Sequence, residues 1–277
     1  MPLLTTITSY WSRPQMLEVW LEAIRSCSIP EVEHILFNVG NGPSMLTAAE
    51  QLRIVPIASL KSIGHAHNFG AKRATTEWIM KLDVDTLPSL NFFSDLLDVL
   101  AGAKEREWFN CGMVYFRQAM STHYLSKDKM PLSPGFVENV TTQLPTYSTG
   151  SYTLPSATNF ICRRADYLAL GGCDPRFDGY GWEDYQQIYM LERYQLGRDP
   201  LLGVVTLDNV TRRCRDEISR KKARELFERN RTLCLFHRWH PPAEKNRAKV
   251  DANRKVLFDY IQAARAKESL QSQVVMS

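Results

Sequence analysis

The first 85 residues alternate between short apolar runs and amphipathic segments, and this alternation restricts the fold more than any other feature of the chain. Apolar runs at residues 3–8, 34–37, around 54 and 78–82 predict buried strands. Helices are expected at residues 14–24, from about residue 44, and at 64–74. Strands that alternate with helices form parallel sheets. The sequence therefore predicts an α/β fold with a Rossmann-like, mostly parallel central sheet and flanking helices.

The rest of the chain is less regular. Residues 118–153 are rich in Ser, Thr and Pro and show little periodicity, so a long loop is expected there. A strand at 159–163, a helix that ends at glycines 171–172, and a helix over 182–196 follow. From residue 216 onward the chain is charged, and we expect it to be mostly helical with a break at 237–242.

The composition says more about the cellular compartment of the protein than about its binding partners. The six cysteines form no C-x-x-C pair, which argues against a zinc ribbon or a thioredoxin motif and favours a reducing compartment. The sequence contains no apolar run of about 18 residues, so no transmembrane helix is predicted. No signal peptide is visible. A cytoplasmic protein is therefore expected. The net charge of +4 permits an anionic ligand or surface without requiring one.

The fourth predicted strand ends in Asp83-Val84-Asp85, at the edge where parallel α/β sheets bind their ligands. Two carboxylates at positions i and i+2 beyond a strand can point the same way. Mg²⁺ and Mn²⁺ prefer oxygen ligands, and such an ion can bridge a diphosphate and neutralise its charge as it leaves. The alternative is a solvated turn, in which D-x-D triplets are common.

A second acidic pair, Glu183-Asp184, opens the predicted helix at 182–196 directly after a glycine-rich stretch. In one interpretation the carboxylates only compensate the helix dipole, which is worth roughly 0.3–1 kcal/mol per acid. In the other, one of them is a general base that the helix N-terminus keeps ionised. Successive helical residues diverge by about 100°, so at most one of the two acids can face the site squarely.

Histidines form the third candidate group. His237 and His240 are three residues apart, so both could reach one metal ion, or one could bind it while the other lies behind. A pair of surface or core histidines is the alternative. His65 and His67 flank a predicted helix start, where they could donate hydrogen bonds to a phosphate or simply be polar residues of the first turn.

The order of these segments resembles that of family 2 glycosyltransferases. Residues 64–70 (GHAHNFG), followed by 78–85, resemble the family's G-x-A-x-N-x-G … D-x-D stretch. Residues 171–177 (GGCDPRF) and 179–184 (GYGWED) are similar to its GG-x-D-x-x-F … G-x-G-x-E-D block. The Trp-Glu-Asp form also resembles the C-terminal domain of β-1,4-galactosyltransferases and chondroitin polymerase domains, in which a downstream histidine completes the metal site. The resemblance spans residues 3–242.

The resemblance implies a glycosyltransferase A fold and an inverting, metal-dependent transfer of a hexose. The donor would be a nucleoside-diphosphate sugar, with UDP expected, and the cofactor Mn²⁺ or Mg²⁺. The acceptor would be a glycan or a lipid-linked sugar in polysaccharide biosynthesis, with peripheral association at the inner face of the membrane as an option. We expect a catalytic domain at 1–242, with a nucleotide-sugar half at 1–117 and an acceptor half at 118–242, and a helical C-terminal extension at 243–277.

Individual roles follow from the same resemblance. Asp184 would be the catalytic base, while Glu183 and Trp182 would contact the acceptor. The metal ligands would be Asp83, Asp85, His237 and His240. One histidine suffices, and His237 is favoured because the prolines at 241–242 restrict the backbone around His240.

The nucleotide-sugar would contact Thr8, Ser9, Tyr10, Asn38, His67, Asn68 and Asp83. The sequence departs from the family at two of these positions. Asn38-Val39 stand where the family usually has an acidic pair that helps to hold the base, and His67 stands where Arg is common.

Three other functions are alternatives to sugar transfer onto a glycan or lipid. A nucleotidyltransferase should have a glycine-rich phosphate loop after the first strand, but residues 9–14 contain no glycine. A non-catalytic carbohydrate-binding protein of this fold would bind a nucleotide-sugar without turnover. Transfer to a nucleic-acid base hydroxyl would need the basic runs at 212–215 and 220–222 to face the polymer. The alternative for these runs is a solvated helix face balanced by nearby acids.

Overall fold

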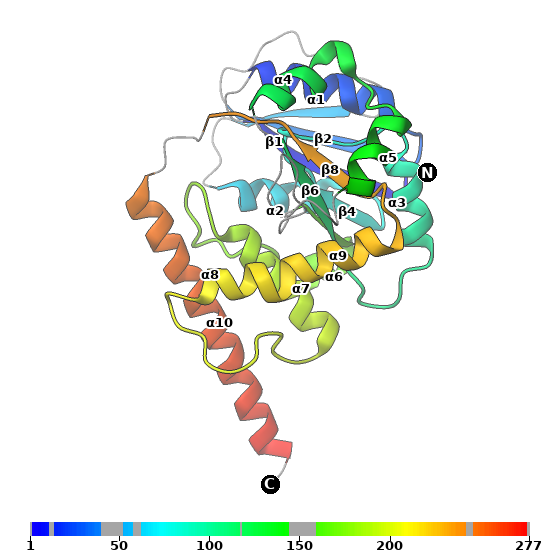
Figure 1. Ribbon diagram of the computed structural model, residues 1–277. Helices are drawn as coiled ribbons and strands as arrows, with labels where there is room; N and C mark the ends of the chain where they lie inside the picture. The colour runs from blue at the N-terminus through cyan, green and yellow to red at the C-terminus, as the bar shows by residue number, and fades with distance from the viewer. Residues whose placement is uncertain are drawn as a thin grey trace.

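The protein has an α/β fold built around one mixed sheet (Figure 1). The computed structural model describes residues 2–10, 14–39, 52–57, 62–116, 118–143, 159–241 and 246–275. In these ranges eight strands form a sheet in the order β3-β2-β1-β4-β7-β6-β8-β5. Successive strand residues belong to two different hydrophobic cores, as Ile79 and Met80 do. Helices therefore cover both faces of the sheet, as predicted.

The N-terminal half of the sheet confirms the predicted strand–helix alternation. The parallel strands are β1 (Leu4–Tyr10), β2 (Val32–Val39), β3 (Leu52–Ile57) and β4 (Trp78–Lys81). α1 (Pro14–Cys27) begins at a proline, which suits a first helical position. α2 (Ile63–Arg73) is capped by Ser62, whose side chain accepts a hydrogen bond from the His65 backbone. The short helix expected from residue 44 lies outside the described residues.

Antiparallel pairs appear in the C-terminal half, which contains β5 (Thr86–Leu87), β6 (Phe109–Tyr115), β7 (Asn159–Arg163) and β8 (Cys234–His237). β7 runs antiparallel to β4 and β6, β5 runs antiparallel to β8, and β6 and β8 are parallel. The accompanying helices are α3 (Phe92–Ala101), α6 (Arg164–Ala169) and α7 (Glu183–Leu196). The strand at 159–163 and the helix at 182–196 are thus confirmed.

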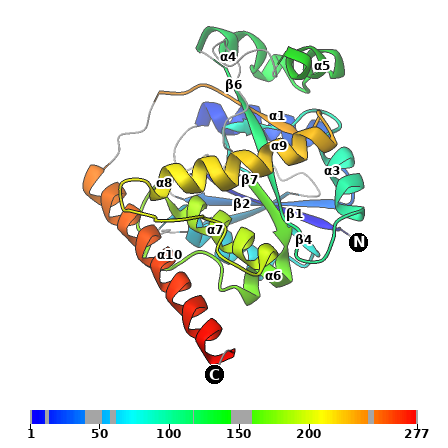
Figure 2. The same ribbon diagram turned by 60° about the horizontal axis from the view of Figure 1, so that its bottom comes forward.

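The prediction of a long loop at 118–153 is wrong for residues 118–143, the part of this range that the structure describes. That part folds into α4 (Gln118–Tyr124), the 3₁₀ turn η1 (Lys127–Lys129) and α5 (Pro134–Gln143), which lie together at one end of the molecule (Figure 2). Tyr124 stacks on Phe136 with ring centroids 5.2 Å apart, and Val137 and Val140 are buried. Tertiary packing of these few apolar residues outweighs the Ser/Thr-rich composition.

The prediction of a mostly helical chain from residue 216 onward is wrong at residues 234–237, which form strand β8. The π-helical segment η2 (Cys214–Ser219) and α9 (Arg220–Arg229) follow α8 (Val210–Arg213), but residues 234–237 form a strand between β6 and β5. Cys234, Leu235 and Phe236 are fully buried there. Periodicity alone cannot tell a four-residue apolar run in a strand from one in a helix.

The C-terminal helix α10 (Arg247–Val275) confirms the predicted helical extension. Its first half packs on the domain, because Asn253, Leu257 and Ile261 are buried there. Arg265 and Glu268 still pair with Asp199 and Arg193, and only the C-terminal end of the helix projects from the body of the molecule (Figure 2). Among the described residues, none of the helices combines the length and the apolar content needed to cross a bilayer.

Candidate active site at the carboxyl edge of the sheet

The Asp83-Val84-Asp85 triplet lies where the sequence predicts it, at the carboxyl edge of the parallel strands. Ile7 of β1 pairs with Lys81 of β4, so the chain leaves the sheet at Asp83 beside the end of β1. The Asp83 backbone N–H donates to Asn159 Oδ1 at 3.2 Å, which ties the triplet to β7. The side chains that follow β4 therefore face the ligand-binding edge of an α/β sheet.

Asp85 meets both candidate histidines. One ligand atom from each of Asp85, His237 and His240 lies within 4.8 Å of the others. His240 Nε2 is 3.0 Å and His237 Nε2 is 3.8 Å from Asp85 Oδ2. β8 produces this meeting, because Thr86 pairs with His237 and the Arg238 backbone N–H donates to the Asp85 carbonyl at 2.9 Å. The three side chains form a compact set of metal-binding atoms.

The hydrogen bonding of His240 suits a cation. Its Nδ1 lies 2.8 Å from the Pro241 carbonyl oxygen, which can only accept, so Nδ1 carries the proton. In the neutral ring the lone pair of Nε2 then faces Asp85 Oδ2 across 3.0 Å. Two acceptors this close need a positive charge, supplied either by a metal ion or by protonation of the ring. His237 stacks on Tyr115 with ring centroids 4.4 Å apart. His240, not the favoured His237, lies nearer to Asp85.

Lys81 joins the two acidic motifs. Its side chain is 2% exposed, and Nζ lies 3.1 Å from Asp83 Oδ2 and 2.8 Å from Asp184 Oδ1. Burial alone would lower the pKa of Lys81, but the charges of Asp184 and Asp83 raise this pKa above its ordinary value. Burial raises the pKa of Asp83 to about 6, with Lys81 opposing and Asp85 adding to the shift. Asp83 is held by the lysine and is not part of the Asp85–histidine group.

The start of α7 separates Asp184 from Glu183, as the helical geometry requires. The Asp184 side chain faces Lys81 and keeps 16% of its surface exposed, so a substrate can reach it. Glu183 is completely buried. Burial raises the pKa of Glu183 to about 8, the Asp184 charge adds to this shift and Lys81 opposes it. Glu183 therefore offers no surface to an acceptor here, because the helix start turns it into the core beside Gly64. Its expected acceptor contact stays a prediction.

Trp182 has a strained backbone, and its indole N–H is hydrogen-bonded within the protein. Its φ of 74° lies in the left-handed region, which costs a residue other than glycine on the order of 1–3 kcal/mol. The indole N–H donates to the Val250 carbonyl of α10 at 2.8 Å, and the ring packs against Tyr185. The indole N–H of Trp182 is therefore already used within the protein and is not free to bind an acceptor in this conformation.

The residues predicted at the end of β1 differ in access. Thr8 and Tyr10 are 0% and 2% exposed, whereas Ser9 on the other face of the strand is partly exposed. Asn38 pairs with Tyr10 in the β1–β2 register, but its side chain lies outside the described residues. Of the three β1 residues, Ser9 is the one that a nucleotide can reach in this conformation.

His67 lies in the interior of the protein, whereas the neighbouring Asn68 is partly exposed. Burial, followed by the charge of Lys81, lowers the pKa of His67 to about 3, and a hydrogen bond that the ring donates to Gln187 opposes this shift. The neutral ring lies 3.2 Å from Gln187 Oε1. It cannot replace a phosphate-binding arginine while it is neutral. Asn68 Oδ1 accepts from Tyr167 and from the Cys173 backbone, and Nδ2 donates to the Cys173 carbonyl. Asn68 thus holds the Gly172–Cys173 turn.

Lys81 is the main functional candidate that the sequence analysis missed. The sequence contains a signal for Lys81, because β4 reads Trp-Ile-Met-Lys and ends next to acidic residues. A lysine in a buried strand is rarely buried unless it is paired with an acid. Tyr115 was missed as well, since β6 was not predicted, and its ring lies against His237.

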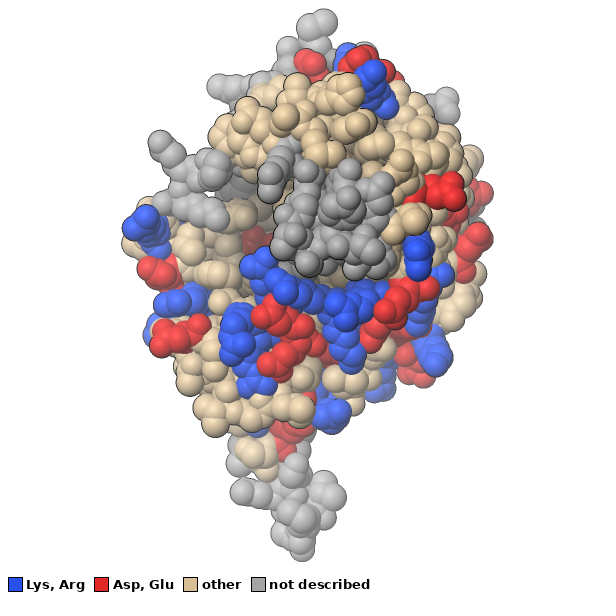
Figure 3. All heavy atoms as spheres, viewed as in Figure 1, with Lys and Arg blue, Asp and Glu red and all other residues tan. Residues whose placement is uncertain are grey.

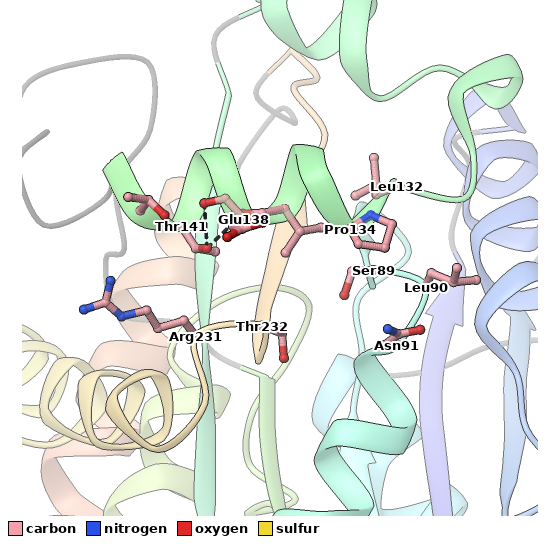
Figure 4. Close-up of a pocket in the computed structure, with 11 residues that line it drawn as sticks. Ser89, Leu90, Asn91, Leu132, Pro134, Glu138, Thr141, Arg231 and Thr232 are labelled. Carbon is pink, nitrogen blue, oxygen red and sulfur yellow. Dashed lines mark hydrogen bonds between the residues drawn. The ribbon is translucent and has the colours of Figure 1, made fainter.

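A separate cavity lies away from these residues (Figure 4). Its volume is about 470 Å³, and it opens between α5, the segment after β5 and the turn before β8. Ser89 and Thr232 lie on its wall, at the opposite end of β5 and β8 from Asp85 and His237. Its lining contains none of the predicted site residues.

Ion pairs neutralise much of the basic run at 212–222. Arg213 pairs with Glu217, Arg220 with Asp216, and Lys221 with Glu225. Figure 3 shows blue and red side chains interleaved over this part of the surface. The mixed pattern fits the alternative of a solvated helix face.

Solved structures similar to this chain include several sugar transferases. A mannosyltransferase from Pyrobaculum calidifontis, in complex with GDP-Man and Mn²⁺, is 14% identical with a TM-score of 0.42, over 69% of this chain and 52% of that one. Glucosyl-3-phosphoglycerate synthase from Mycobacterium tuberculosis, with Mn²⁺, UDP-glucose and phosphoglyceric acid, is 14% identical with a TM-score of 0.43, over 71% and 67%. The chain thus spans about half the length of the Pyrobaculum structure.

The comparison with sequence-family models identifies the family of the chain. No curated protein matches the chain. The α/β sheet with acids at its carboxyl edge agrees with the predicted glycosyltransferase A fold. The model of the family described as "Glycosyltransferase like family 2" matches residues 49–198, more than half of the chain, and the protein therefore belongs to that family.

Proposed function

We propose that the protein is a metal-dependent, inverting glycosyltransferase that moves a hexose from a nucleoside-diphosphate sugar to an acceptor hydroxyl. The observation that carries the proposal is the meeting of both acidic motifs at one sheet edge, where Lys81 contacts Asp83 and Asp184. UDP is the expected nucleotide, and a glycan or lipid-linked sugar is the expected acceptor. Residues 1–117 would supply the donor side of the site and residues 118–242 the acceptor side.

The donor atoms of Asp85, His237 and His240 fit a small divalent cation. Imidazole nitrogen is a better ligand for Mn²⁺ than for Mg²⁺, which prefers oxygen, so Mn²⁺ is favoured. When bound, such an ion neutralises the charge that develops on the leaving diphosphate.

Asp184 is proposed as the base because, of the two adjacent acids at the start of α7, it keeps part of its side chain exposed whereas Glu183 is completely buried. The acceptor hydroxyl oxygen forms a bond to the anomeric carbon while the bond from that carbon to the diphosphate breaks. The hydroxyl proton passes to the Asp184 carboxylate. In-line attack of this kind inverts the anomeric configuration. Lys81 Nζ holds the Asp184 side chain in place, 2.8 Å from Oδ1.

Removing a metal-binding side chain should weaken binding of Mn²⁺ and nucleotide together. His240→Ala and Asp85→Asn should each lower the apparent Mn²⁺ affinity by at least about 10-fold, since even an outer partner of a metal ligand is typically worth 10–100-fold. The measurement is thermal stabilisation by Mn²⁺ with UDP or GDP, because a ligand that binds the folded state raises apparent stability. The same screen, run with nucleotide-sugars and with chelator, measures metal-dependent turnover.

His123→Ala is the matched control, because His123 is an exposed histidine on α4 outside the Asp85 group. It should bind Mn²⁺ like the unchanged protein. Equal Mn²⁺ affinity in His240→Ala, Asp85→Asn and the control would remove this metal site from the proposal. Full turnover in excess chelator would remove the metal requirement itself.

A further inference from the structure

We infer that the C-terminal helix α10 positions the loop that precedes the catalytic base, and that Asn253 is the positioning residue. Asn253 is 2% exposed. Its Oδ1 accepts from the Asp178 backbone N–H at 3.0 Å, and its Nδ2 donates to the Asp178 carbonyl at 2.9 Å. One buried side chain thus satisfies both backbone groups of the residue that begins the Asp178–Trp182 loop. The catalytic consequence rests on the proposed function, whereas the contact itself does not.

The loop needs such support because its backbone is unusual. Gly179, Gly181 and Trp182 have φ values of 71°, 108° and 74°, all in the left-handed region. The two glycines adopt it freely, but a tryptophan does so only where its surroundings over-determine the conformation. The Trp182 indole N–H donates to the Val250 carbonyl, in the first turn of α10. Helix α10 therefore holds the loop at its first residue and at its last.

The loop is enclosed from the other side as well. Gly179 forms a parallel bridge with Ser62, the N-cap of α2. A Cβ atom on Gly179 would stand 3.6 Å from the Lys249 side chain, so α10 packs directly over the glycine. Asp184 follows two residues after Trp182 and meets Lys81 at 2.8 Å. The position of the base is therefore set by α2, α10 and Lys81 together.

This arrangement changes the expected role of the C-terminal segment. A helix that begins at residue 247 and fixes the loop of the acceptor side is part of the site, not an appendage to a domain that ends at 242. The exposed pair of Lys249 and Asp178 adds little, since both side chains are about half exposed. The buried Asn253 contacts carry the interaction.

Hydrogen exchange tests the contact without reference to activity. In Asn253→Ala, amide protection across residues 178–184 should fall by about 10-fold or more, because both hydrogen bonds to the Asp178 backbone are lost. Asn110→Ala is the matched control. Asn110 is also fully buried, and its Nδ2 donates to the Ser219 carbonyl and hydroxyl, away from the loop. Lys249→Met removes the exposed pair at the loop itself. Neither control should change protection of residues 178–184 relative to the rest of the chain.

Kinetics then test the positioning role. With donor and Mn²⁺, Asn253→Ala should raise the acceptor KM and lower kcat for transfer, while the affinity for UDP and Mn²⁺ stays within about twofold. Trp182→Phe keeps an aromatic ring but loses the hydrogen bond to Val250, and it should loosen the same residues, so the test survives if Asn253→Ala fails to fold. Unchanged protection at 178–184 in both variants would overturn the inference. So would equal loss in Asn253→Ala and Asn110→Ala. An unchanged protein that neither binds nucleotide nor transfers sugar would refute the proposed function and leave the exchange result to decide this contact.

Discussion

Asp184→Asn is expected to lower sugar transfer by about 10²-fold or more while leaving nucleotide and Mn²⁺ binding nearly unchanged. A sugar hydroxyl is a very weak acid, so its proton must leave during attack, and a placed carboxylate typically contributes about 10²–10⁴-fold. The asparagine keeps the shape of the side chain and an oxygen that can face Lys81, but it cannot take the proton. Steady-state transfer and titration of the nucleotide, measured on the same preparation, separate the two effects.

Glu183→Gln is the comparison that makes this result specific. The pKa of Glu183, raised to about 8 chiefly by burial, leaves this carboxyl largely protonated at neutral pH, so glutamine resembles its resting form. Transfer should fall far less than in Asp184→Asn. If Asp184→Asn kept near-normal transfer while Glu183→Gln abolished it, Glu183 would be the catalytic base and Asp184 would have the other role. A product that retains the donor's anomeric configuration would contradict in-line attack with a single base.

Local patterns were enough to predict the half of the fold that holds the Asp83–Asp85 triplet. The first four strands are buried runs between amphipathic helices, and their parallel pairing follows from that alternation. The triplet is contiguous in sequence and sits directly after β4, so its place at the sheet edge follows as well. The start of α7 was also predictable, because glycines and acids mark a helix N-terminus.

The parts that failed depend on contacts between distant residues. Which histidine approaches Asp85 is set by the pairing of β5 with β8, and β5 has two residues and β8 has four. Such short strands leave no periodic signal. The burial of His67 and the hydrogen bonding of Asn68 depend on Gln187 and Tyr167, which are far away in the chain. A family motif therefore located these residues near the site without revealing that they support it from inside.

Lys81→Met is expected to produce the largest loss of stability of any change at the site. Lys81 is buried between Asp83 and Asp184, and its removal leaves two carboxylates near each other without their shared cation. Breaking a buried ion pair from one side typically costs about 3–5 kcal/mol. The acids here keep 27% and 16% of their side-chain surface exposed, and solvent screening reduces the cost, so the lower end of that range is expected for the free energy of unfolding. Chemical denaturation with chelator present measures it without a contribution from metal.

Two further variants decide whether the loss comes from the ion pairs rather than from the missing side-chain volume. Lys221→Met, on the surface of α9, removes an exposed pair with Glu225 and should cost less than about 1 kcal/mol. In a double-mutant cycle, Lys81→Met with Asp184→Asn should destabilise less than the sum of the two single changes, with a coupling of at least about 1 kcal/mol, because the residues are in direct contact. Additive effects would mean that the 2.8 Å contact contributes no stability. The base would then be held by α2 and α10 alone, and Lys81→Met should leave the Asp184 side chain in position for transfer.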